Sequence, residues 1–170
     1  MLMDMIDVES CIDYYALNIY IGNMDWPVVN TTLWRTRKYS GNSDYSDGRW
    51  RWCIHDVNGS MFCENAQKDL IQRCIEMDPF FAKLMENSRF RNNIIQRMLH
   101  LAELTFSPDR VNAWVDDYVM RMENSMQKDY ERFYNKQLSI EDFYTGCESI
   151  KTFFELRNEY VLQKYGARDE

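Results

Sequence analysis

A long amphipathic helical pattern in the second half of the chain limits the folds open to this sequence. After Ser107-Pro108, apolar residues recur at three- and four-residue spacing, at Val111, Trp114, Val115, Tyr118, Val119, Met122 and Met126. Such spacing lines up side chains along one face of a helix. Ser107 is a favourable N-cap, and Pro108 suits a first helical turn. The pattern therefore predicts a long helix with one face in a core.

Two further regions carry helical signals before this long helix. In residues 8–21 the apolar set follows the same period, and it consists of Ile12, Tyr15, Ala16 and Ile19. Asp7 can cap this helix, because its carboxylate can accept from free backbone amides, and Gly22 can end it. The pattern in residues 79–104 predicts one or two helices, and Pro79 suits the first helical turn.

The last helical signal begins at Ser139, with Glu141 and Asp142 in its first turn. Its expected core-facing residues are Phe143, Cys147, Ile150 and Phe154. Gly166 is expected to end this helix. With the long helix before it, this segment predicts an α-helical lobe.

The first half of the chain also contains strand-forming segments. Residues 31–37 and 49–55 are rich in β-branched and aromatic residues, which favour strands. The connector at 40–48 consists mainly of polar and turn-forming residues, so the two segments predict a hairpin. The expected fold class is α+β and mainly α-helical, with one small hairpin, as a single domain over residues 1–170.

Composition allows a folded core and argues against nucleic acid as a partner. The 170 residues are 45% apolar and 15% aromatic, and the net charge is −7. A uniformly acidic protein repels phosphate backbones, although Arg35, Arg37 and Lys38 form one local basic cluster that could hold a phosphate. The five cysteines lack close C-x-x-C spacing, so we expect free thiols and no zinc site.

The sequence gives no signal for a membrane span or a secretory leader. No apolar run approaches the ~20 residues needed to cross a bilayer. The first residues include Asp4 and Asp7 and no basic residue, unlike a signal peptide. We therefore expect no membrane span in this chain.

Three polar residues suggest chemistry. Asp25 and Asn30 form a D-x-x-x-x-N pattern in a loop, and Asp56 directly follows the second predicted strand. Protein kinases use this order, in which an Asp meets the substrate hydroxyl, an Asn holds a metal, and a later Asp holds the same metal. Mg²⁺ and Mn²⁺ favour such hard oxygen ligands. Turn formation or helix capping is the alternative interpretation of each residue, since D-x-x-x-x-N also occurs by chance.

At these residues the chain resembles the CotH family of atypical kinases, first associated with spore coats. Residues 8–18 and 22–30 are similar to the family's helix and its Gly-Asn-x-Asp-Trp-Pro-x-x-Asn loop. Residues 48–52, leading to Asp56, resemble the strand before its metal motif. Residues 90–91, 105–111 and 153–157 resemble its helical C-terminal part, so the similarity covers nearly the whole chain.

The resemblance implies a protein-kinase-like C-lobe that carries part of an ATP- and metal-dependent site for Ser or Thr phosphorylation. It implies that Asp25 is the catalytic-loop aspartate and that Asn30 and Asp56 bind Mg²⁺ or Mn²⁺. Trp50 matches a tryptophan that could stack on adenine, with core packing on the strand as the alternative. The partners implied are a protein substrate and, through an exposed cleft surface, a second copy of the chain.

The chain also departs from the family pattern. His55 stands where the family usually has Trp, and Asn58 stands where it usually has a second Asp. Because Asn is neutral, a metal at this position loses a charged ligand. The family's upstream lobe, with its phosphate-gripping basic residues, has no counterpart in these 170 residues, so we expect this lobe to be inactive by itself. An inactive, pseudokinase-like scaffold at a spore, cell or extracellular surface is therefore the alternative function.

Overall fold

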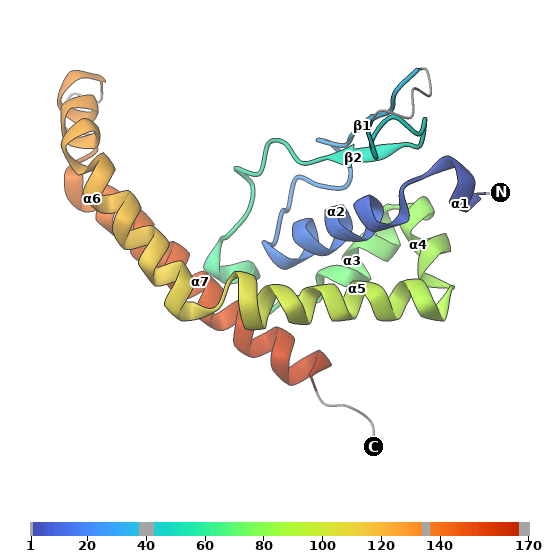
Figure 1. Cartoon of the computed structure of the whole chain (residues 1–170). Helices are drawn as coiled ribbons and strands as arrows, with labels where there is room; N and C mark the ends of the chain where they lie inside the picture. The colour runs from blue at the N-terminus through green and yellow to red at the C-terminus, as the bar shows by residue number, and fades with distance from the viewer. Residues whose placement is uncertain (1, 38–42, 134–136, 167–170) are drawn as a thin grey trace. The chain divides into compact units, whose positions relative to one another are not determined.

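The computed structural model describes residues 2–37, 43–133 and 137–166, and it divides into two compact units. The first unit contains α1 (Leu2–Met5), α2 (Val8–Tyr20), β1 (Thr32–Trp34), β2 (Arg51–Cys53), α3 (Leu70–Met77), α4 (Pro79–Met85) and most of α5 (Ser88–His100). The second contains the 3₁₀ turn η1 (Cys63–Asn65), the π-helix η2 (Leu101–Thr105), α6 (Pro108–Phe133) and α7 (Ile140–Tyr165) (Figure 1). The fold is mainly helical with one small antiparallel sheet, as predicted, while one domain over residues 1–170 stays a prediction.

Helix α2 is the centre of the first unit. It begins where predicted, because the Asp7 carboxylate accepts from the Ser10 amide at 3.1 Å. Most of its residues are buried, namely Cys11, Ile12, Tyr14, Tyr15, Ala16, Asn18, Ile19 and Tyr20. Arg97 of α5 pairs with Glu9 on its exposed side at 3.2 Å. The helix therefore has neighbours on several faces, although the sequence predicted burial of one.

The hairpin is shorter than predicted. Strands β1 and β2 pair in antiparallel register, with Thr32 opposite Cys53 and Trp34 opposite Arg51. The side chain of Arg51 is buried, and its guanidinium pairs with Asp47 at 2.9 Å and with Asp7 at 2.8 Å. Hydrogen bonds from Arg51 hold the pKa of Asp47 below its usual value. This cluster ties β2 to the start of α2. Of the predicted connector and basic cluster, residues 40–42 and Lys38 lie outside the described residues.

Helix α3 was not predicted from the sequence. Asp69 caps it by accepting from the Gln72 amide at 3.2 Å, and its buried residues are Leu70, Ile71 and Cys74. It is too short to give a strong periodic signal. Asp78 ends α3 and begins α4, where its carboxylate accepts from the amides of Phe80 and Phe81. Pro79 begins α4, as predicted.

In the second unit α6 and α7 run antiparallel and side by side (Figure 1). Helix α7 begins with the predicted cap, since the Ser139 amide donates to Asp142 at 2.7 Å, and its expected core residues Phe143 and Cys147 are buried. The predicted core face of α6 is wrong in part. Its side chains Trp114 and Tyr118 are 47% and 48% exposed, because a helix packed mainly on one partner buries only a narrow stripe.

Arg157 joins two segments of the second unit. Its side chain is fully buried in α7, and the guanidinium donates to the carbonyls of Ala66 and Lys68, each at 3.0 Å. These carbonyls belong to the turn at the end of η1. A buried carbonyl without a donor is costly, so Arg157 stabilises the turn.

None of the described helices is long and apolar enough to span a bilayer.

We predict that Arg157→Met lowers the free energy of unfolding by about 2–3 kcal/mol, because the buried carbonyl of Ala66 and the part-buried carbonyl of Lys68 lose their donor. Urea denaturation followed by far-UV circular dichroism measures this change. Arg121→Met is the matched control, because exposed Arg121 pairs with exposed Asp117 on the same helix, and we expect a change within about 0.5 kcal/mol. Equal losses in both variants would contradict the role given to Arg157.

Candidate functional site

The hairpin brings two of the predicted site residues to the same end of the sheet. Asn30 lies two residues before Thr32, at the start of β1, and Asp56 lies three residues after Cys53, at the end of β2. Because Thr32 and Cys53 are directly paired in an antiparallel ladder, the chain enters β1 and leaves β2 at one edge. At this same end of the sheet, Thr32 Oγ1 and His55 Nε2 lie 3.4 Å apart. The segments with Asn30 and Asp56 therefore lie side by side.

Asp25 meets the turn that follows Asp56. The Met24 amide donates to the Gly59 carbonyl at 2.9 Å. A Cβ atom added to Gly59 would lie 2.7 Å from Oδ2 of Asp25, so any side chain at this position would have to displace that carboxylate. The Asp25 carboxylate thus lies directly against the backbone of Gly59. The structure brings the loop at 25–30 and the turn at 56–59 into one site.

Buried contacts hold the loop on both sides of Asp25. Trp26 is 2% exposed, and its indole packs edge-on against Tyr14 and Tyr15 of α2. Arg73 of α3 donates to the Met24 carbonyl at 2.7 Å and to the Trp26 carbonyl at 2.5 Å. The backbone is therefore fixed at residues 24 and 26, while the Asp25 side chain between them is exposed.

Both predicted metal ligands occupy left-handed backbone conformations. The φ angles are +61° at Asn30 and +49° at Asp56. Asn and Asp tolerate this region better than other residues with side chains, so turns of this kind favour these residue types. The Tyr14 hydroxyl supports the first turn by donating to the Asn30 carbonyl at 3.3 Å. Asp56 is exposed and Asn30 half-buried, so both side chains are accessible to a ligand.

The two residues predicted to bind a metal, Asn30 and Asp56, carry oxygen donors. Within the described ranges, no three histidine, cysteine, aspartate or glutamate side chains cluster in a way that could hold a metal ion. Asn58, in the position where a second acid was expected, is exposed and neutral. Mg²⁺ is commonly held by one or two carboxylates, with water and substrate phosphates as the remaining ligands. Asp56 and Asn30 supply the kinds of oxygen donor that such a shared site uses.

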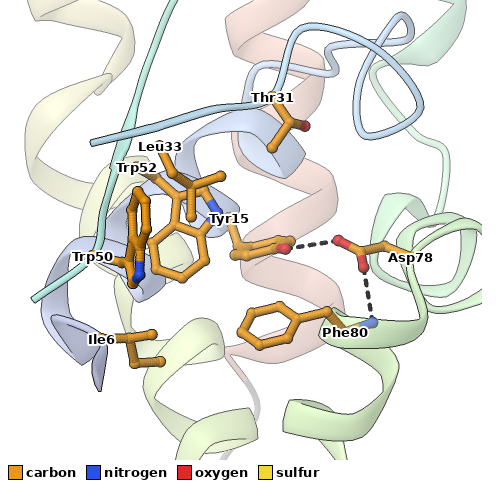
Figure 2. A pocket seen from close by; sticks show the side chains of 8 residues that line it. All are labelled: Ile6, Tyr15, Thr31, Leu33, Trp50, Trp52, Asp78 and Phe80. Atoms are coloured by element: carbon orange, nitrogen blue, oxygen red, sulfur yellow. Dashed lines mark hydrogen bonds between the residues drawn. The ribbon is translucent and has the colours of Figure 1, made fainter. Parts of the chain in front are cut away.

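Trp50 lies at a separate aromatic pocket of the first unit. The pocket has a volume of about 410 Å³ and is lined by Ile6, Tyr15, Thr31, Leu33, Trp50, Trp52, Asp78 and Phe80 (Figure 2). Trp50 is half-buried, and the guanidinium carbon of Arg35 lies 4.7 Å from its ring centroid. Thr31 connects this pocket to the loop, because it directly follows Asn30.

The comparisons with known proteins identify the family. The family model described as CotH kinase protein matches residues 1–161. The chain belongs to the CotH kinase family. Neither the curated proteins nor the solved structures contain a match to it. Membership in the CotH kinase family supports a kinase-like function, while the roles of individual residues stay predictions.

Sequence reasoning missed the residues that position this CotH kinase loop. Arg73 is 47 residues from Trp26 in the chain, and no local pattern indicates that its side chain reaches the loop. Gly59 follows Asp56 by three residues, and no local pattern indicates its role. Its close approach to Asp25 appears only in three dimensions.

We predict that Gly59→Ala displaces the Asp25 carboxylate while the fold is kept, because only the end of that side chain stands in the way of the new methyl group. In ¹H–¹⁵N spectra, we expect shifts confined to the amides of residues 24–30 and 56–60. An unchanged Asp25 amide signal would contradict the close approach.

Gly146→Ala in α7 is the matched control, because a Cβ at Gly146 would meet no atom within 4 Å. Alanine is the better helix former, so this variant should gain up to about 1 kcal/mol of stability and leave the loop signals unchanged.

Proposed function

We propose that this CotH kinase chain carries part of a phosphotransferase site, which transfers phosphate from ATP to a Ser or Thr hydroxyl of a protein. The observation that carries the proposal is the approach of Asp25 to Gly59, because it joins the loop at 25–30 to the turn at 56–59. An attacking hydroxyl and a metal-bound phosphate must lie beside each other in such a reaction.

Asp25 is the proposed catalytic-loop aspartate. Its exposed carboxylate can accept a hydrogen bond from the substrate hydroxyl and hold the proton as the oxygen attacks phosphorus. The new P–O bond forms to the hydroxyl oxygen, and the bond between the γ-phosphorus and the bridging oxygen of ADP breaks. The contacts with Arg73 and Gly59 fix the backbone on both sides of Asp25, which lowers the entropic cost of aligning its carboxylate.

Asp56 and Asn30 are the proposed ligands for Mg²⁺ or Mn²⁺. The ion would neutralise charge on the transferring phosphate oxygens. Asp56 contributes a charged oxygen and Asn30 a neutral one, and ATP phosphates would supply further ligands. Because Asn58 adds no charge, we expect weaker metal binding than in a site with two acids.

Two surfaces near the loop suit the remaining ligands. The half-buried ring of Trp50 offers a flat face for stacking the adenine of ATP. Val28 and Val29, within the loop, are 64% and 53% exposed. These apolar side chains beside Asp25 suit contact with a protein, either the substrate or a second copy of the chain.

An inactive scaffold is the second candidate function. It is favoured by the neutral Asn58 and by the lack, among the described residues, of a cluster of three potential metal ligands. In a scaffold the loop would keep its structure and bind a protein through Val28 and Val29, without a metal.

We predict that the wild-type chain shows a measurable heat of binding when it is titrated with ATP in the presence of Mn²⁺. Asp56→Asn should weaken this binding by at least about tenfold, because it removes the charged ligand and keeps the side-chain shape. Asp109→Asn is the matched control, because Asp109 is an exposed residue in the first turn of α6. We expect this variant to bind ATP and Mn²⁺ with unchanged affinity.

Absence of heat with the unchanged chain would overturn the phosphotransferase proposal and favour the scaffold. Equal affinity for the unchanged chain and Asp56→Asn would show that ATP binds without the proposed metal ligand.

A further inference from the structure

Asp78 places a carboxylate at the edge of the aromatic pocket. It lies where α3 ends and α4 begins, and its side chain points toward Tyr15 across the pocket wall (Figure 2). All other lining residues except Thr31 and Tyr15 are apolar or indole side chains. A charged acceptor on an otherwise aromatic wall fixes the orientation of a flat ligand, because the ligand's donor edge must face it.

The hydrogen bonds of Asp78 leave one acceptor position open. Its Oδ1 accepts from the amides of Phe80 at 2.9 Å and Phe81 at 3.2 Å. Its Oδ2 accepts from the Tyr15 hydroxyl at 2.7 Å. An ionised carboxylate has about four lone-pair sites, so Oδ2 keeps one site for another donor.

Tyr15 keeps its proton and therefore remains a donor to Asp78. Burial raises the pKa of Tyr15, and the hydrogen bond to Asp78 raises it further. The Tyr15 ring also stacks on Phe81 at a centroid distance of 4.5 Å, which fixes the hydroxyl direction. The open acceptor site on Oδ2 is thus held in place from two sides.

The size and lining of the pocket suit a single aromatic base. Its volume of about 410 Å³ falls in the range of small-ligand sites. Trp50, Trp52 and Phe80 supply flat apolar faces, and Trp52 and Phe80 stack on each other with ring centroids 5.9 Å apart. The pocket also borders the loop through Thr31, which directly follows Asn30.

We propose that Asp78 determines base specificity by accepting a hydrogen bond from the exocyclic amino group of adenine. This inference rests on the proposed function, because it assigns the pocket to the base of the nucleotide. A single open acceptor matches the amino group of adenine. Guanine presents two adjacent donors, which pair best with both oxygens of a carboxylate, and Oδ1 already accepts from two amides.

The test uses nucleosides without metal, so that it does not depend on Asp56. Adenosine, purine riboside, which lacks the amino group, and guanosine are titrated into the ¹⁵N-labelled chain, and the Trp50 indole signal is followed. We expect adenosine to bind about tenfold more tightly than purine riboside, because the unpaired acceptor penalises the latter.

Asp78→Asn keeps an oxygen for the α4 cap and replaces the other oxygen with an NH₂ group. Adenosine should then bind about tenfold more weakly, while purine riboside should be unaffected. Asp69→Asn is the matched control, because Asp69 caps α3 in the same way and does not line the pocket. We expect that control to keep the preference for adenosine. Thermal unfolding of both variants checks that the fold is retained.

Equal affinities for adenosine and purine riboside, tighter binding of guanosine, or no shift of the Trp50 signal would each overturn the role of Asp78. These results are separate from the metal titration. Adenosine selectivity that Asp78→Asn abolishes, together with no Mn²⁺-dependent ATP binding, would keep the base pocket and overturn phosphoryl transfer.

Discussion

Burial of the Trp26 indole against α2 is the contact on which the candidate site depends. The ring centroid of Trp26 lies 5.8 Å from that of Tyr14 and 5.3 Å from that of Tyr15. Burying so large a side chain is worth several kcal/mol, and the residue beside it must follow. Asp25 is therefore held at the surface directly above the core. Its side chain is exposed, while Trp26 and Arg73 anchor the backbone on either side of it.

The rest of the site is built on the same division between a rigid backbone and accessible side chains. Arg73 fixes the carbonyls on either side of Asp25, and the antiparallel register fixes the ends of β1 and β2. Asn30 and Asp56 adopt left-handed turns at those ends. Metal and phosphate chemistry needs such preorganisation, because the protein contributes mainly position and charge. These features suit the proposed metal site, although the described residues contain no cluster of three potential metal-ligating side chains.

Local signals allowed much of the fold to be predicted. The caps at Asp7 and Ser139 and the start at Pro79 depend on nearby residues, so the sequence alone indicates them. The order and spacing of Asp25, Asn30 and Asp56 can also be recognised in the sequence. Contacts between segments that are distant in the sequence cannot be predicted in this way. The hydrogen bonds from Arg73 to the loop, the approach of Gly59 to Asp25 and the hydrogen bond from Tyr15 to Asp78 all depend on the packed structure. The exposed Trp114 shows the same limit, because periodicity predicts a face and does not reveal how much of it a partner covers.

The central claim is that the loop at 25–30 and the turn at 56–59 hold one metal ion together. Paramagnetic broadening by Mn²⁺, added in small amounts to the ¹⁵N-labelled chain with ATP, tests it most directly. We expect the amide signals of Asp25, Asn30, Asp56 and Gly59 to broaden first and together. Broadening that is uniform, or that is centred on the acidic side chains of α6, would contradict a shared site.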